Sequence, residues 1–141
     1  MMIDLHSEFG RAVQRHIKDQ YVIWLTTVDS TLTPQPRPVW FVYEDDSFLI
    51  YSQAHAHKVA HIKKHPRVAL NFNTDESGDK HVIVFTGEAV IDEGYPPAHA
   101  VPTYFEKYKD GIAGLEMTPE NFSRDYSVAI RIRPTGVRGW E

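Results

Sequence analysis

Short apolar runs separated by polar turns dominate the first two thirds of the chain. Gly87 falls between two of these runs and predicts a β-bulge there. Tight turns at residues 29–31 and 44–47 would join the first three runs into a meander. Because the runs are rich in β-branched and aromatic residues, they predict strands at residues 21–28, 39–43, 47–51, 68–72, 82–85, 88–91 and 127–133.

Apolar residues with helical spacing predict helices in the remaining segments. Near the start, every fourth position from Phe9 to Ile17 is apolar, which predicts a helix over residues 4–19. Asp4 or Ser7 would cap its first turn. Further helices are expected at residues 56–65, ended by Pro66, at residues 96–115, and after Thr118, where Pro119 takes the first helical position.

This order of elements indicates one mainly β (α+β) domain that spans residues 1–141. A chain of 141 residues can bury a sufficient core without disulfides or metals. Six or seven short strands and three or four helices predict a closed antiparallel barrel with helices on its outside.

Composition and charge exclude several classes of function. The formal net charge of -4 argues against a general nucleic-acid binder, which would need a basic face. The chain has no cysteine, so thiolate nucleophiles, disulfides and cysteine-ligated metal sites are excluded. No signal peptide and no stretch of about 20 apolar residues is evident, so we expect a cytoplasmic protein that does not bind membranes.

Residues 51–68 have the clearest chemical pattern. A predicted strand ends in Tyr51, Ser52 and Gln53, and a helix follows with Lys58 in its first turn. A helix N-terminus attracts anions, and a lysine there is disfavoured by the helix dipole unless an anion is close. The segment therefore predicts a phosphate site, although Lys58 could also be a solvated residue on a basic helix face.

Two motifs in this part of the chain resemble the split β-barrel flavin-binding proteins related to pyridoxamine 5′-phosphate oxidase. One is Arg37-Pro-Val-Trp-Phe41, and the other places Lys58 eight residues before Pro66-Arg-Val-Ala69. The tail from Asp125 to Trp140 is similar to a subgroup known as deazaflavin-dependent oxidoreductases. Together the motifs and the order of elements cover roughly residues 20–92.

The resemblance implies a homodimeric split β-barrel of six to seven antiparallel strands with flanking helices. It implies a flavin mononucleotide (FMN)-dependent oxidoreductase that exchanges a hydride at flavin N5 with a small-molecule substrate, in clefts between two subunits. The segment from Arg37 to Trp40 would line the flavin ring or ribityl chain, and Lys58 would pair with the phosphate. The candidate cofactor-binding residues are Arg37, Pro38, Val39, Trp40, Tyr51, Ser52, Gln53, His57, Lys58 and Trp140, and no catalytic residue is assigned.

Two departures from the oxidase pattern bear on activity. The oxidase has an arginine just before the helix lysine, where this chain has His57, so we expect weaker or pH-dependent phosphate binding. Its C-terminal Arg/His substrate motif has no counterpart among Arg131, Arg133 and Arg138, so pyridoxamine 5′-phosphate oxidase activity is not expected. Trp40 could instead belong to the core, and Trp140 could anchor the tail.

Several alternatives remain open. His57, His61 and His65 share one helix face, as in a His-based metal site, but no carboxylate follows in a metalloprotease-like pattern and we expect no metal. Haem bound through a histidine is a weaker alternative. The cofactor could be 8-hydroxy-5-deazaflavin, whose longer acidic tail would need cations such as Arg37, Lys58 and Lys63. The protein could also be a non-catalytic flavin carrier.

Overall fold

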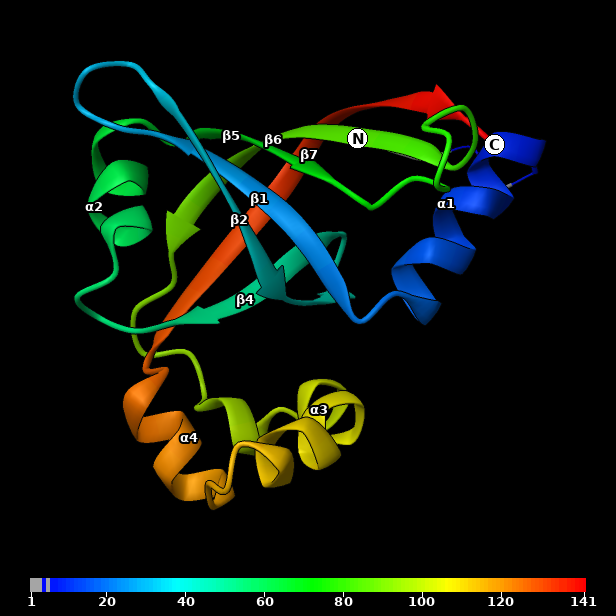
Figure 1. The fold of residues 1–141 in the computed structure, drawn as a ribbon. Helices are drawn as coiled ribbons and strands as arrows, with labels where there is room; N and C mark the ends of the chain where they lie inside the picture. Colours follow the sequence, from blue (N-terminus) through cyan, green and yellow to red (C-terminus); the bar gives the residue numbers. More distant parts are fainter. Residues whose placement is uncertain (1–3, 5) are drawn as a thin grey trace.

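One antiparallel sheet of seven strands curls into a half-barrel (Figure 1). The computed structural model describes residue 4 and residues 6–141. The strand order is β2-β1-β5-β6-β7-β4-β3, so β2 and β3, which are consecutive in the chain, lie at opposite edges. The strands are β1 (Val22–Val28), β2 (Pro34–Trp40), β3 (Val42–Glu44), β4 (Ser47–Ser52), β5 (Arg67–Asn71), β6 (Val82–Ile91) and β7 (Val128–Trp140).

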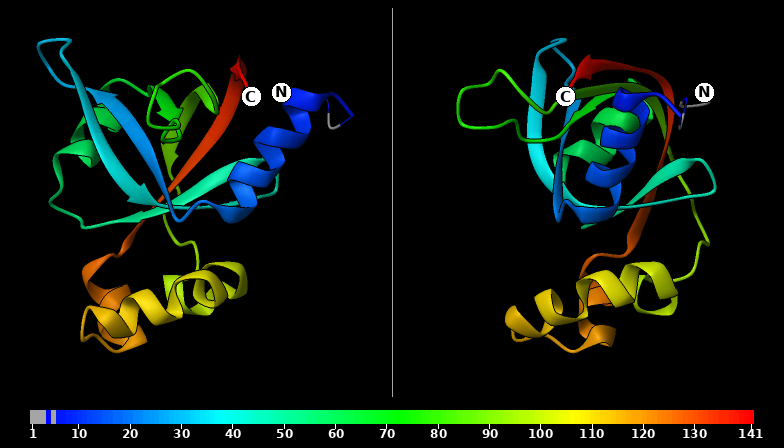
Figure 2. Two further views of the ribbon diagram at one scale, coloured as in Figure 1. Left: turned by 45° about the vertical axis from the view of Figure 1, so that its right-hand side comes forward. Right: turned by 90° about the vertical axis from the view of Figure 1, so that its right-hand side faces the viewer.

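Four α-helices surround the sheet in two groups. The helices α1 (Glu8–Asp19) and α2 (His57–Lys64) flank opposite sides of the half-barrel (Figure 1). The other two, α3 (Pro102–Gly114) and α4 (Pro119–Asp125), form a separate helical layer that begins with the 3-10 turn η1 (Ala98–Ala100). Figure 2 shows this layer lying against one side of the half-barrel in both views. No helix in the described part of the chain is long and apolar enough to cross a membrane.

Two of the predicted helix starts are confirmed in detail. The Ser7 hydroxyl accepts a hydrogen bond of 2.9 Å from the Gly10 N–H at the start of α1. The Thr118 hydroxyl likewise accepts a hydrogen bond of 3.1 Å from the Asn121 N–H at the start of α4. Each satisfies one donor that the first helical turn leaves unpaired. The first helix thus begins after Ser7 rather than at residue 4.

Strand β4 is buried on both faces, because the helical layer packs against the face that points away from the barrel interior. Phe48 and Ile50 point into the barrel interior, whereas Leu49 and Tyr51 pack against the helical layer. Successive side chains of a strand point to opposite faces, so one apolar run serves two cores. All six residues of β4 are buried as a result.

The predicted strand at residues 39–43 is in fact divided at Phe41. Residues up to Trp40 pair with β1, and residues from Val42 pair with β4. The chain therefore crosses from one edge of the sheet to the other at a single residue. The apolar run is continuous in sequence because both halves face buried surfaces.

The predicted bulge at Gly87 is present, but it lies within one strand, β6, instead of between two. The pairing of β6 with β7 shifts register between Thr86 and Gly87. A Cβ atom on Gly87 would lie 2.9 Å from the Arg133 carbonyl oxygen, so only glycine fits this close approach. On the partner strand, Pro134 pairs opposite the bulge.

Two further boundaries differ from the predictions. The last strand was expected to end at Pro134, but β7 continues to Trp140, because a proline is tolerated next to a register shift. The helix expected over residues 96–115 begins only at Pro102, after η1. The sheet also forms a half-barrel with two edge strands instead of a closed barrel.

Candidate functional site

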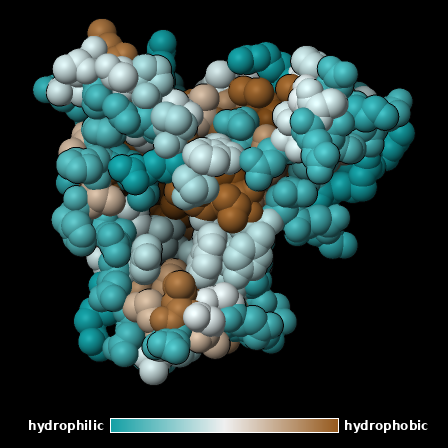
Figure 3. Space-filling view, viewed as in Figure 1, coloured by the Kyte–Doolittle hydropathy of each residue, from teal (hydrophilic) through white to brown (hydrophobic). Residues whose placement is uncertain are grey.

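A cavity of about 350 Å³ lies between the half-barrel and the helical layer. Figure 3 shows apolar surface in this region, between the sheet above and the helices below. Its size falls at the lower end of the range for small-molecule pockets, about 300–1,000 Å³. One cation, Lys58, lines it among residues that are otherwise apolar or aromatic: Val22, Pro38, Val39, Trp40, Tyr51, Tyr104, Leu115, Phe122 and Tyr126.

Five of the predicted cofactor-binding residues meet at this cavity. Pro38, Val39 and Trp40 come from the end of β2, Tyr51 from the end of β4 and Lys58 from the first turn of α2. These elements adjoin because β2 and β4 both end beside the helical layer. The two sequence motifs, separated by about ten residues, thus form one wall.

Lys58 is half-buried, and no carboxylate of the described residues lies within ion-pair distance of it. Burial lowers the pKa of Lys58 from its ordinary value, and the neighbouring Arg37 guanidinium lowers that pKa further. Two cations are therefore close together without an acidic partner. Such an arrangement is unfavourable by itself and favours the binding of an anion.

The rest of α2 fixes the position of Lys58. Val59 and Ile62 bury the apolar face of the helix. His61 Nδ1 lies 2.9 Å from the hydroxyl oxygen of Thr27, a buried residue of β1. No side chain caps the first turn, and that turn contains no acidic residue. The start of α2 therefore leaves its backbone donors without a side-chain acceptor, beside the Lys58 ammonium group.

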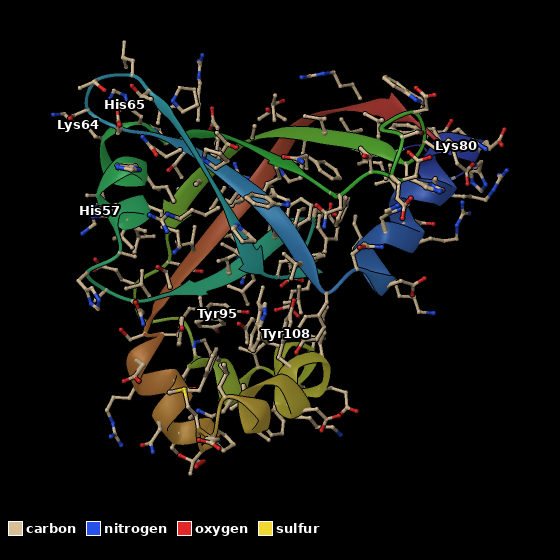
Figure 4. The ribbon with its side chains drawn as sticks, in the orientation of Figure 1. His57, Lys64, His65, Lys80, Tyr95 and Tyr108 are labelled. Carbon is tan, nitrogen blue, oxygen red and sulfur yellow. The ribbon has the colours of Figure 1, made fainter. Side chains whose placement is uncertain are left out.

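Trp40 is held in place by the helical layer. Its ring stacks on Tyr108 with centroids 4.6 Å apart and planes 3° apart. The buried Tyr108 hydroxyl accepts a 2.7 Å hydrogen bond from the Phe41 N–H and lies 2.7 Å from the Tyr21 carbonyl oxygen. Figure 4 shows Tyr108 between α3 and the sheet. The Trp40 face that stacks on Tyr108 is therefore covered, and only its remaining surface can contact a ligand.

The other predicted residues do not line the cavity. Arg37 is exposed and acts on Lys58 only through its charge. The buried Ser52 hydroxyl donates to the carbonyl oxygen of half-buried Gln53 at 3.0 Å, so both residues shape the loop. His57 is exposed and points outward from α2 (Figure 4).

Trp140, also a predicted site residue, lies away from the cavity. Its indole N–H donates to the Asp79 carbonyl oxygen at 2.5 Å, in the loop that contains Lys80. Figure 4 shows Lys80 on the opposite side of the molecule from α2. The β6–β7 register explains this position, because Trp140 pairs with Val82 at the far end of the strands. Within this chain, Trp140 is an anchor of the tail and not a cavity residue.

Half of the cavity lining was not predicted. Tyr104, Leu115, Phe122 and Tyr126 belong to the helical layer or its flanking loops, and Val22 begins β1. Tyr104 and Tyr108 are four residues apart in the segment predicted as the third helix, a spacing that places them on one helix face. That pattern indicated burial, but it did not indicate which part of the sheet the face would cover.

Comparison with known proteins gives a family match and shared folds. The sequence profile of the family described as pyridoxamine 5′-phosphate oxidase matches residues 9–141. The heme-storage protein HutZ of Vibrio cholerae has a TM-score of 0.69 and 17% identity, covering 98% of this chain and 94% of that chain. An F420 reductase has a TM-score of 0.66 and 19% identity, covering 89% of this chain and 94% of that chain. An FAD-binding protein of Mesorhizobium loti has a TM-score of 0.63 and 13% identity, covering 91% of this chain and 89% of that chain. No curated protein sequence matches the chain.

Proposed function

The chain belongs to the pyridoxamine 5′-phosphate oxidase family, and on that premise we propose that it is a flavin-dependent oxidoreductase that binds FMN. The single observation that carries the proposal is Lys58, a half-buried cation without a carboxylate partner among the described residues, at the edge of an aromatic cavity. A ring with an anionic tail is the ligand chemistry that suits both features. We further propose that the protein acts in the cytoplasm as a homodimer.

The residues of the cavity fit such a cofactor. Trp40, Tyr51 and Phe122 provide apolar surface for a planar ring, and Lys58 with the first turn of α2 would hold the phosphate. A charge-assisted contact of this kind contributes about 1.5–3 kcal/mol. When bound, the flavin would supply hydride transfer at N5, and the protein would supply position and electrostatics. The aromatic walls would exclude water from the ring.

The neighbouring structures name different ligands, so the cofactor must be tested against alternatives. The F420 reductase supports 8-hydroxy-5-deazaflavin as a second candidate, and FAD is a third. Haem is disfavoured at this cavity because its lining contains no histidine among residue 4 and residues 6–141. A second subunit would be expected to cover the open side of the cavity and to contact the rest of the cofactor.

Parallel titrations of the purified protein test the proposal. FMN, FAD and 8-hydroxy-5-deazaflavin are titrated by fluorescence, and we expect binding of FMN at micromolar concentration. Lys58→Ala should weaken binding about tenfold, as expected from the loss of about 1.4 kcal/mol. Lys64→Ala is the matched control, because Lys64 is exposed on the same helix and its loss changes the net charge equally.

Each outcome of this experiment has a defined meaning. Failure of all three flavins to bind would remove the proposal, and equal affinities for wild type and Lys58→Ala would remove the role of Lys58. Binding without any reduction of the flavin by NADH or NADPH would favour a non-catalytic carrier. Light scattering tests the dimer, which a monomer mass would contradict.

A further inference from the structure

Tyr104 differs from the other buried tyrosines of the helical layer. Its ring is enclosed: the residue is 1% exposed, and its centroid lies 5.0 Å from that of Tyr51 and 4.8 Å from that of Tyr108. The Tyr51 hydroxyl donates to the Pro96 carbonyl oxygen at 2.6 Å, and the Tyr108 hydroxyl lies 2.8 Å from the Phe41 carbonyl oxygen. No hydrogen bond joins the Tyr104 hydroxyl to any described residue.

Tyr104 contributes to the cavity wall, and its hydroxyl is not bonded by any described residue. The one fully enclosed side-chain polar atom without a partner, among the described residues, is His81 Nδ1. The Tyr104 hydroxyl is not among such atoms, so it is not fully enclosed by the described residues. Buried tyrosine hydroxyls normally have a hydrogen-bond partner. An unused donor in the wall of an aromatic cavity is available to an acceptor atom of a ligand.

The hydroxyl is also held in its protonated form. Burial raises the pKa of Tyr104, and the neighbouring tyrosines raise that pKa further. The group thus donates a hydrogen bond at any physiological pH and does not become an anion. Lys58, at the same cavity, supplies the positive charge separately.

We infer that Tyr104 donates a hydrogen bond to a carbonyl oxygen of the ring bound in this cavity and so selects rings that carry such an acceptor. The inference rests on the proposed function, because it assigns a specificity residue to the same site. A hydrogen bond to a charged acceptor is stronger than one to a neutral acceptor. Since reduction places negative charge on a flavin ring, Tyr104 should stabilise reduced FMN more than oxidised FMN.

Tyr95 provides a comparison outside the cavity. It is half-buried and does not line the cavity, and its hydroxyl donates a 3.3 Å hydrogen bond to the Glu44 carboxylate. Tyr95→Phe therefore deletes the same atom away from the proposed cofactor site.

The test is the affinity of Tyr104→Phe, Tyr95→Phe and wild type for oxidised FMN and for dithionite-reduced FMN, measured without oxygen. We expect Tyr104→Phe to weaken binding of oxidised FMN about threefold and of reduced FMN about tenfold or more. Tyr95→Phe should change both by less than about twofold. Equal losses for the two redox states, or no loss, in Tyr104→Phe would overturn the inference.

A second measurement changes the ligand as well as the protein. FMN analogues with sulfur in place of the C2 or the C4 carbonyl oxygen accept hydrogen bonds poorly, so one of them should bind wild type more weakly than FMN. That difference should vanish in Tyr104→Phe, and its persistence there would contradict the assignment. If Lys58→Ala weakens FMN binding but Tyr104→Phe does not, only the role of Tyr104 fails. If wild type binds no flavin, the proposed function itself fails.

Discussion

The two hydrophobic clusters of this protein differ in chemistry. Inside the half-barrel, every buried residue of the cluster is valine, isoleucine, leucine, phenylalanine or alanine. Between the sheet and the helical layer, the cluster contains three buried tyrosines, Tyr51, Tyr104 and Tyr108, with Trp40 packed against them. The buried side chains of the first cluster have no polar group to satisfy, whereas the buried hydroxyl groups of the second cluster need hydrogen-bond partners. Aromatic residues with a polar end suit a region that borders a cavity.

The comparison shows how one sheet serves both stability and binding. Strand β4 and the start of β7 contribute alternate residues to the two clusters. A substitution that shifts one of these strands would therefore change the packing of both clusters. The barrel cluster can be packed as tightly as its shapes allow. The second cluster leaves a cavity, and two of its tyrosines, Tyr51 and Tyr108, fix the walls by hydrogen bonds to backbone groups.

The largest expected effect is in the barrel. Phe85 is fully buried, and its ring lies 5.0 Å from Phe48. Phe85→Ala should lower the free energy of unfolding by about 3–5 kcal/mol. Phe122→Ala, in the cavity wall, should cost less, because Phe122 already borders empty space. Urea unfolding measures both variants, and an equal or larger loss in Phe122→Ala would contradict the difference between the clusters.

A smaller effect is expected from the hydrogen bonds of the second cluster. Tyr108→Phe keeps the ring but leaves the buried Phe41 N–H without its acceptor. The expected loss is about 1–3 kcal/mol in the free energy of unfolding. Tyr95→Phe is the control, because the Tyr95 hydroxyl donates only a 3.3 Å bond to the Glu44 carboxylate. A loss no larger than that of the control would show that the Tyr108 bonds contribute little.

The smallest expected effect is a pH dependence at the same junction. The Lys107 ammonium donates to the Phe41 carbonyl oxygen at 2.9 Å, and burial lowers the pKa of Lys107 to about 8. Between this pKa and the ordinary lysine pKa of 10.5, the unfolded chain binds more protons than the folded protein. Stability contributed by this group should therefore rise with pH across that window.

Urea midpoints at about pH 7.5 and about pH 9.5 test this dependence. Lys107→Met should show a smaller rise between the two values than wild type, while Lys109→Met should resemble wild type. Lys109 is exposed on the same helix and pairs with Glu106 at 3.1 Å. An identical rise in wild type and Lys107→Met would exclude Lys107 as its source.

Local patterns predicted much of this protein correctly. Runs of β-branched and aromatic residues identified the strands, and Ser7 and Thr118 marked helix starts because capping is decided within one turn. The motif around Lys58 correctly identified a lysine at the start of a helix next to a strand end, because these residues are close in sequence.

The tertiary structure decided which distant segments meet. The strand is interrupted at Phe41 because the residues before it pair with β1 and the residues after it pair with β4. These two strands lie far apart in the sheet. The pairing of β6 with β7 carries Trp140 away from the cavity, and the docking of the helical layer brings Tyr104 and Tyr126 into it. The sequence by itself determined which residues prefer burial and where turns and caps occur. Only the folded chain determined which buried surfaces face each other, because that choice depends on packing between residues separated by half the chain.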